Sequence, residues 1–373
     1  MDAVDYAALV ARLSASSAAR RVGLLSQQAS PTAELLHARI VDRLACLFSP
    51  EHGWFGLAAA GEKTHSTVHP FWRIPVHSLY GATRTPTPDM MRGLDCIVVD
   101  LQDIGVRCYT YLATLRNMLN AAAAAHVPVI VLDRPIPLGG VVDGPRLAPG
   151  GASFVAPIDV PLCHGMTPGE CATYIVRTEH LDLDLDVVRL RDWSHAVRTP
   201  WMNFVPPSPA IRSWDCAALY PVTVFTEACP ALDCDRYGPL AFRVLGAPWL
   251  DVAQVCDGLR DVLPSFGLNV RPIRYRPSGG AWEGQVLDGL LFSIEDPEVY
   301  RPVRAGVAIY SAMLKRHPEE CARDARPDWF DKLMGTSAPR EVLGSASAHD
   351  GLFASWETEA AAFRATRVDL YAR

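Results

Sequence analysis

The fold is decided by the stretch CIVVDLQDIGVRCYTYLATLRNMLNAAAAAHVPVIVLDR, residues 96–134. It begins with a continuous apolar run, Cys96 to Leu101, which is closed by acidic side chains. Such a run is typical of a parallel strand that is buried on both faces. A helical segment, Thr110 to His126, follows and is rich in alanine, the strongest helix former. A second buried strand, Pro128 to Leu132, completes a strand–helix–strand unit.

The same alternation extends toward the N-terminus. A strand is predicted at Arg21 to Leu25, a helix at Thr32 to Leu44 and another strand at Ala45 to Phe48. Strands that alternate with helices indicate a parallel sheet, so we expect an α/β, Rossmann-like domain. In such sheets ligands bind outside the carboxyl ends of the strands. Polar residues follow each strand at this edge: 49–52, 100–103 and 133–134.

The second part of the chain alternates less regularly. A T-x-x-E capping box at Thr167 and Glu170 opens a further helix. Beyond it, helices are predicted near 251–263, 303–316 and 356–367, and strands near 269–275 and 287–294. We therefore predict two domains: a Rossmann-like catalytic domain over 1–229 and a smaller α+β domain over 230–373.

Composition limits the classes of function. The chain has 373 residues, 49% hydrophobic and 20% charged, with a net charge of −6, as is ordinary for a soluble globular protein. This modest charge favours neither nucleic acid nor a membrane surface as partner. Ten cysteines without a CxxC pair indicate a reducing compartment, so we expect a cytoplasmic protein. No HExxH, GxGxxG or Walker pattern occurs, and we expect neither metal nor cofactor.

A carboxylate and an imidazole follow the strand that ends near Phe48. The segment FSPEHGWFG, residues 48–56, places Glu51 and His52 together on a loop, which suits acid/base chemistry. The alternative is a hydrogen-bonded turn with Glu51 in solvent. AGEKTH, residues 60–65, adds Glu62, and glycoside hydrolysis needs two such carboxyl groups.

Further candidates follow the other strands. Arg107 suits a two-point contact with a substrate carboxylate, and Tyr111 offers a flat ring to a sugar. The alternative is that Asp100 pairs with Arg107 and organises the turn. Asp133 and Arg134 form a similar pair that is either structural or functional, and His164 precedes the capping box.

Many segments in order carry a resemblance to a known family. They are VGLLSQQAS, LFSPEHGWFG, AGEK, IPVHSLYG, DCIVVDLQDIGVRCYTYLATL, VLDRPIPLGG, HGMTPGE, PPSP, GAPWL and YRPVRAG. Together they resemble the exo-β-N-acetylmuramidases, collinearly from Val22 to Trp249 and more thinly beyond. The resemblance implies a glycoside hydrolase that releases N-acetylmuramic acid from the non-reducing end of peptidoglycan-derived saccharides, its small-molecule partners.

The resemblance also implies residue roles. It gives Glu51 the catalytic role, with Glu62 or Glu227 as the second carboxyl group. Around the pocket it places His52, Asp100, Arg107, Tyr111, Asp133 and His164. Arg107 or Arg134 would bind the lactyl carboxylate that distinguishes muramic acid from glucosamine.

One region departs from the family pattern. Where the family reads close to EGTN and then GRGT, this chain has FTEACPALD and CDRYGPLAF, residues 225–242. Glu227 is retained, and Arg236 is what remains of the arginine motif. Because small polar groups that would bind a sugar are lost, two alternatives stay open. The chain is either a catalytically silent sugar-binding protein on the same fold or a glycosidase retuned to a different small glycoside.

Overall fold

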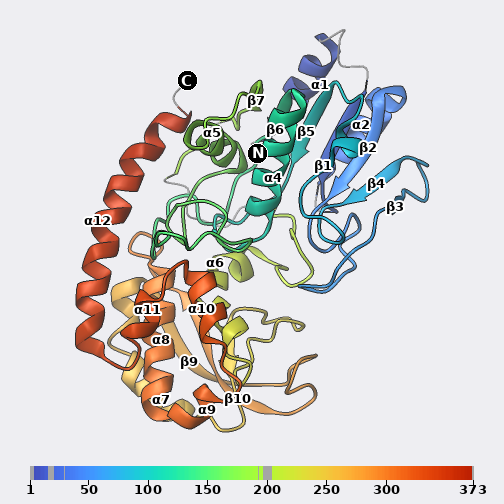
Figure 1. The fold of residues 1–373 in the computed structure, drawn as a ribbon. Helices are drawn as coiled ribbons and strands as arrows, with labels where there is room; N and C mark the ends of the chain where they lie inside the picture. The colour runs from blue at the N-terminus through green and yellow to red at the C-terminus, as the bar shows by residue number, and fades with distance from the viewer. Residues whose placement is uncertain (1–3, 16–20, 29, 192, 196–203, 372–373) are drawn as a thin grey trace.

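The protein consists of two halves that pack against each other, as the computed structural model shows (Figure 1). The structure describes residues 4–15, 21–28, 30–191, 193–195 and 204–371. The first half is built on a seven-stranded sheet and the second on a three-stranded sheet. The predicted boundary at residue 229 stays a prediction.

The large sheet has the strand order β3-β4-β2-β1-β5-β6-β7. All of its neighbouring strands run parallel except β3, which pairs antiparallel with β4 at one edge. Its strands are β1 (Val22–Ser26), β2 (Leu44–Ser49), β3 (Thr67–Val68), β4 (Pro75–Ser78), β5 (Cys96–Asp100), β6 (Val129–Leu132) and β7 (Leu185–Val188). The predicted α/β, Rossmann-like fold is confirmed, with β3, β4 and β7 as strands that the sequence pattern did not indicate.

The central strands are apolar throughout because helices cover both faces of the sheet. Successive residues of β5 belong to different cores: Ile97 and Val99 face one cluster, and Val98 faces the other. In β1, Leu25 belongs to the first cluster and Leu24 to the second. This alternation follows from the two-residue period of a strand.

Two groups of helices supply these faces. Leu9 of α1 and Leu36 of α2 pack in one core, whereas Leu115 of α4 and Ile175 of α5 pack in the other. The helices of this half are α1 (Tyr6–Ala15), α2 (Thr32–Ile40), the 3-10 helix η1 (Val41–Arg43), α3 (Pro88–Met91), α4 (Tyr111–Ala125) and α5 (Pro168–Thr178). The predicted capping box at the start of α5 is present, with Thr167 and Glu170 each bonded to the other's backbone.

The second half has an antiparallel sheet with the strand order β8-β10-β9, packed against helices. Its strands are β8 (Val244–Gly246), β9 (Leu268–Tyr275) and β10 (Leu287–Ile294). Its helices are α6 (Trp214–Thr223), η2 (Val224–Ala228), α7 (Val252–Leu259), η3 (Leu263–Phe266), α8 (Pro302–Arg316), α9 (Pro318–Ala322), α10 (Pro327–Met334), α11 (Ala338–Glu341) and α12 (Ala346–Tyr371). The predicted smaller α+β unit is confirmed.

Helix α12 ties the halves together. It runs along one side of the molecule from α8 to α5, as the red helix of Figure 1 shows. Arg367 donates from Nη1 to the carbonyl oxygens of Gly139, His164 and Gly165 in the first half. Nearer the second half, Glu357 pairs with Arg304 of α8 at 2.9 Å. None of the helices described combines the length and the apolar character that a membrane span needs.

Candidate active site

A cavity of about 510 Å³ lies where the two halves meet. The first half contributes the loop after β2, with Glu51 and His52, and the start of α4, with Tyr109 and Thr110. The second half contributes η2 and the loops that precede β8 and β10, which include Glu227. A volume of this size is typical of small-molecule sites. Loops at the carboxyl end of the parallel sheet therefore form one wall of the cavity, and the second half forms the opposite wall.

Glu51 is fixed by two short hydrogen bonds. Its Oε1 accepts from the backbone N–H of Gly61 and its Oε2 from the Thr110 hydroxyl, both at 2.6 Å. Gly61 has φ +78°, a conformation that suits glycine and turns its N–H toward the carboxylate. A carboxylate has about four lone-pair sites, so each oxygen keeps capacity for a ligand. Glu51 is only 7% exposed yet lines the cavity.

His52 is held by the turn that it forms. Its φ of +73° is left-handed, which is rare for a residue other than glycine and is found at functional sites. Nδ1 lies 2.9 Å from the carbonyl oxygen of Ala58, so Nδ1 carries the proton in the neutral ring. His52 lines the cavity beside Glu51. The ring nitrogen that is not bound to Ala58 is the one with capacity for a ligand.

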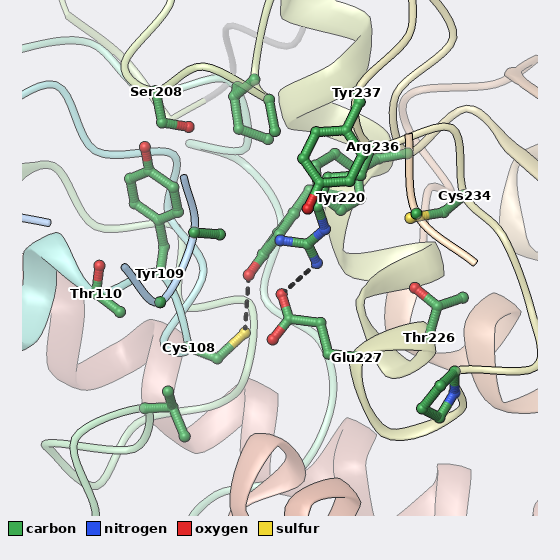
Figure 2. A pocket seen from close by; sticks show the side chains of 18 of the residues that line it. Cys108, Tyr109, Thr110, Ser208, Tyr220, Thr226, Glu227, Cys234, Arg236 and Tyr237 are labelled. Atoms are coloured by element: carbon green, nitrogen blue, oxygen red, sulfur yellow. Dashed lines mark hydrogen bonds and ion pairs between the residues drawn. The ribbon is translucent and has the colours of Figure 1, made fainter. Parts of the chain in front are cut away.

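Glu227 faces the cavity from the second half. Arg236 donates from Nη2 to its Oε1 at 2.6 Å, and Figure 2 shows the carboxylate between this guanidinium and Cys108. Burial lowers the pKa of Arg236, but the charge of Glu227 outweighs this and holds that pKa above its usual value. The arginine therefore keeps its charge and orients the carboxylate.

Aromatic rings form much of the remaining wall. Tyr80 and Tyr109 line the cavity from the first half, and Tyr220, Trp282 and Trp329 line it from the second half. Burial, reinforced by the Glu51 carboxylate, raises the pKa of Tyr80 to about 12, so its phenol stays protonated. Flat rings and protonated hydroxyls suit the faces and edges of a sugar.

Cys108 also lines the cavity, and its Sγ lies 3.8 Å from the Tyr220 hydroxyl, as Figure 2 shows. Burial raises the pKa of Cys108 to about 12, with a further contribution from Glu227. Because only the thiolate is a strong nucleophile, Cys108 does not act as one at neutral pH.

The structure places Asp100 and Arg134 outside this cavity, in a closed network. Arg134 donates from Nε and Nη2 to Asp100, and its Nη2 also reaches the hydroxyl oxygens of Ser30 at 2.9 Å and Tyr6 at 3.0 Å. The side chains of Asp100 and Arg134 are 0% and 4% exposed. Asp100 thus pairs with Arg134, not with Arg107, and the pair has a structural role.

Asp133 and His164 are also fully buried away from the cavity. Asp133 accepts from the Thr167 hydroxyl and the Gly169 N–H, both at 2.8 Å, and so holds the start of α5. His164 accepts at Nδ1 from the N–H of Met166 at 3.1 Å. Burial lowers the pKa of His164 to about 3, so the ring is neutral.

Arg107 joins the two halves and does not line the cavity. Its guanidinium donates to the carbonyl oxygens of Pro145 at 2.8 Å and Val160 at 2.6 Å, and to those of Leu333 and Met334 at the end of α10 at 3.4 and 2.5 Å. Burial lowers the pKa of Arg107 to about 10, which still leaves it charged. Its Nη1 and Nη2 groups are used by the fold and its side chain lies outside the lining, so it does not hold a substrate in this cavity.

Tyr111 and Glu62 also lie outside the lining. Tyr111 is buried and donates to the carbonyl oxygen of Pro207 at 2.7 Å. Glu62 is exposed, and its Oε2 accepts from the N–H of Ala59 at 2.8 Å. Glu62 therefore shapes the turn that carries Gly61 and does not face Glu51 across a pocket.

Sequence reasoning missed several lining residues. Thr110 and Tyr80 stand within the motifs DLQDIGVRCYTYLATL and IPVHSLYG, so their position in a motif was a signal. Asp233, Trp282 and Arg326 come from the second half, where strand ends gave no signal. Among the described residues, no group of three or more His, Cys, Asp or Glu side chains is arranged to hold a metal ion.

Comparison with known proteins gives matches over most of the chain. Residues 19–215 match the family model described as exo-beta-N-acetylmuramidase NamZ, N-terminal, and residues 218–372 match its C-terminal counterpart. A peptidoglycan beta-N-acetylmuramidase NamZ from Bacillus subtilis (strain 168) is 31% identical over 361 residues, which cover 93% of this chain and 86% of that protein.

Solved structures match the fold along its whole length. A DUF1343 family protein from Bacteroides fragilis NCTC 9343 superposes with a TM-score of 0.86 at 27% identity, covering 98% of this chain and 97% of that one. A second DUF1343 family protein of that organism gives a TM-score of 0.75 at 24% identity, covering 97% of each chain. The second likeness concerns the fold alone.

Proposed function

Because this chain belongs to the exo-beta-N-acetylmuramidase NamZ family, we propose that it is an exo-acting glycosidase that releases N-acetylmuramic acid from peptidoglycan-derived saccharides. The bond would be cleaved at the non-reducing end of the saccharide. The observation that carries the proposal is the shared cavity, in which Glu51 from the first half and Glu227 from the second line one sugar-sized space.

Glu51 is the proposed acid/base. Glycoside hydrolysis requires a carboxyl group that gives a proton to the leaving oxygen and a second that assists attack at the anomeric carbon. The hydrogen bonds from Gly61 and Thr110 fix the position of Glu51, and each of its oxygens retains a lone pair for a proton or a substrate hydroxyl. His52 would bind the sugar through Nε2, because its Nδ1 is bound to the carbonyl oxygen of Ala58.

Glu227 is the proposed second carboxyl group. Its ion pair with Arg236 keeps it oriented toward the centre of the cavity (Figure 2), where positive charge develops on the sugar ring in the transition state. Glu62 is exposed and belongs to the turn, so it is not part of this proposal. Tyr80, Tyr109 and Tyr220 would contact the ring and its hydroxyl groups.

We also propose that the enzyme works in the cytoplasm, on saccharides that enter cell-wall recycling. All ten cysteines are free and buried, which supports a reducing compartment. A small saccharide also fits the size of the cavity better than a polymer does.

The test is hydrolysis of a chromogenic aryl N-acetylmuramide by the wild-type chain and by Glu51→Gln. Wild type is expected to release the aryl group, and Glu51→Gln is expected to lower kcat about a thousandfold, within the range for loss of a general acid/base. Gln keeps the shape: its amide oxygen can accept from the Gly61 N–H, and its NH2 group can donate to the Thr110 hydroxyl, so circular dichroism should show an unchanged fold.

Three outcomes separate this proposal from its alternatives. A wild type that binds N-acetylmuramic acid without turning over any glycoside would indicate a silent sugar-binding protein. Turnover of another member of an aryl glycoside panel in preference to the muramide would indicate a retuned glycosidase. Equal rates for wild type and Glu51→Gln would remove Glu51 from the mechanism.

A further inference from the structure

We infer that Arg326 binds the carboxylate of the lactyl group and so selects muramides over glucosaminides. This inference rests on the proposed function, because the lactyl group is what N-acetylmuramic acid has and N-acetylglucosamine lacks. It assigns an anion subsite to the wall of the cavity that the second half provides.

The charges of the cavity make such a subsite necessary. Glu51, Glu227 and Asp233 all line it, so an anionic substrate meets three carboxyl side chains. At a few ångströms in a partly buried site, two like charges repel by several kcal/mol. The orientation that places the carboxylate of a muramide against a cation is therefore favoured.

The cations of the lining are Arg236 and Arg326. Arg236 is committed to Glu227 at 2.6 Å. The exposed Arg326 has no carboxylate partner among the described residues, and its one side-chain hydrogen bond to them runs from Nη2 to the carbonyl oxygen of Glu227. The other cations considered from the sequence, Arg107 and Arg134, are buried in structural networks.

The backbone fixes Arg326 next to the catalytic wall. Its N–H donates to the carbonyl oxygen of Ala228 at 2.8 Å, so the residue is anchored to η2 twice. A guanidinium has five N–H donors in a planar fork, and one contact through Nη2 leaves donors for a carboxylate. Because the anchor is the backbone of η2, the bound carboxylate would lie on the wall of the cavity that η2 forms.

A second feature of the lactyl group also finds a partner. The group carries a methyl beside its carboxylate, and Trp329 lines the cavity from the first turn of α10, where its N–H donates to the carbonyl oxygen of Arg326 at 3.0 Å. The half-buried indole offers an apolar face to that methyl. Arg326 thus matches the carboxylate of the lactyl group, and Trp329 matches its methyl group.

The experiment compares kcat and KM for an aryl N-acetylmuramide and for its N-acetylglucosaminide in wild type, Arg326→Gln, Arg326→Lys and the control Arg323→Gln. Arg323 is exposed, lies three residues earlier and does not line the cavity. Arg326→Gln is expected to raise KM for the muramide ten- to a hundredfold, the scale of a lost hydrogen bond to a charged group. KM for the glucosaminide should change less than about twofold, and Arg326→Lys, which keeps the charge without the fork, should lie between.

A merely structural role predicts a different result. If Arg326 only anchored η2, its variants would raise KM for both substrates equally. This result, or an unchanged KM for the muramide, would overturn the inference.

If wild type shows no turnover, the test is calorimetry with N-acetylmuramic acid and N-acetylglucosamine. A wild-type preference for the former that disappears in Arg326→Gln supports the subsite although the proposed function has failed. A preference that persists, or is absent from wild type, overturns the subsite.

Discussion

Two arginine–carboxylate pairs, Asp100–Arg134 and Glu227–Arg236, have the same chemistry and different surroundings. The first lies at the carboxyl end of β5 with side chains 0% and 4% exposed, and Ser30 and Tyr6 complete its hydrogen bonds. The second lies on the cavity wall with 22% exposed at the carboxylate and 19% at the arginine. The first pair is closed to any ligand, and the second presents a carboxylate to one.

The difference shows that residue type does not separate a structural pair from a functional one. Both pairs satisfy the rule that a buried charge needs a partner. What distinguishes them is the hydrogen-bonding capacity that remains after the fold has been satisfied. The closed pair joins residues at the ends of β5 and β6, and the open pair orients one carboxylate in the cavity.

The largest expected effect comes from breaking the closed pair. Arg134→Met leaves the Asp100 carboxylate buried without its cation, which is expected to lower the free energy of unfolding by about 3–5 kcal/mol. Because the pair does not line the cavity, KM for the aryl muramide should stay within about twofold of wild type at a temperature where the variant is folded. Urea unfolding and steady-state kinetics measure the two quantities.

A double variant checks the cause of that loss. Asp100→Asn combined with Arg134→Met removes both charges, so it should recover a large part of the stability that Arg134→Met loses. A double variant as unstable as Arg134→Met would show that packing, and not the unpaired charge, explains the effect. A raised KM in either variant would instead return Arg134 to the binding site.

A smaller effect is expected from neutralising the open pair. The side chain of Glu227→Gln can still accept a hydrogen bond from Arg236. It lacks the negative charge that stabilises the positive charge developing on the sugar ring, so kcat should fall about a hundredfold. The matched control is Glu62→Gln, whose side chain is exposed and should leave kcat within about twofold. Similar kcat values for the two variants would contradict the assignment of the second carboxyl group to Glu227.

Much of the fold was predictable because the central strands carry their own signal. Buried parallel strands such as β5 and β6 read as unbroken apolar runs, and the helix between them is alanine-rich. The short strands β3 and β7 gave no signal, since all their residues except Val188 are exposed or only partly buried and their pairing depends on neighbours distant in sequence. Helix α6, which contains Pro221, was also missed.

The candidate site was harder to predict for a geometric reason. The sequence predicted that polar residues after the strands lie at one edge of the sheet. It could not show which of these residues would form all their hydrogen bonds with other parts of the protein. Asp133 and Thr167 are far apart in sequence and bond at 2.8 Å, so Asp133 is satisfied by a partner that only the fold supplies. Arg326 reaches the cavity from the other half, where no strand-end rule applies.

The smallest expected effect is the change in stability with pH that comes from His164, which is buried outside the cavity. Burial lowers the pKa of His164 from 6.5 to about 3. Between these values the unfolded chain binds a proton that the folded chain does not, so stability falls as the pH decreases below 6.5, by about 1.4 kcal/mol per pH unit. His164→Asn, whose Oδ1 can accept from Met166 in place of Nδ1, should lose this contribution.

The measurement is the free energy of unfolding in urea at pH 7, 6 and 5 for wild type, His164→Asn and the exposed control His126→Asn. His126 ends α4 at φ +51°, a conformation that asparagine tolerates, so its variant should keep the wild-type slope. The free energy of unfolding of His164→Asn should depend less on pH than that of wild type. The difference in free energy between the two proteins should therefore become smaller as the pH decreases. Parallel curves would contradict this prediction, because they would mean that His164 takes up its proton in the folded state as it does in the unfolded chain.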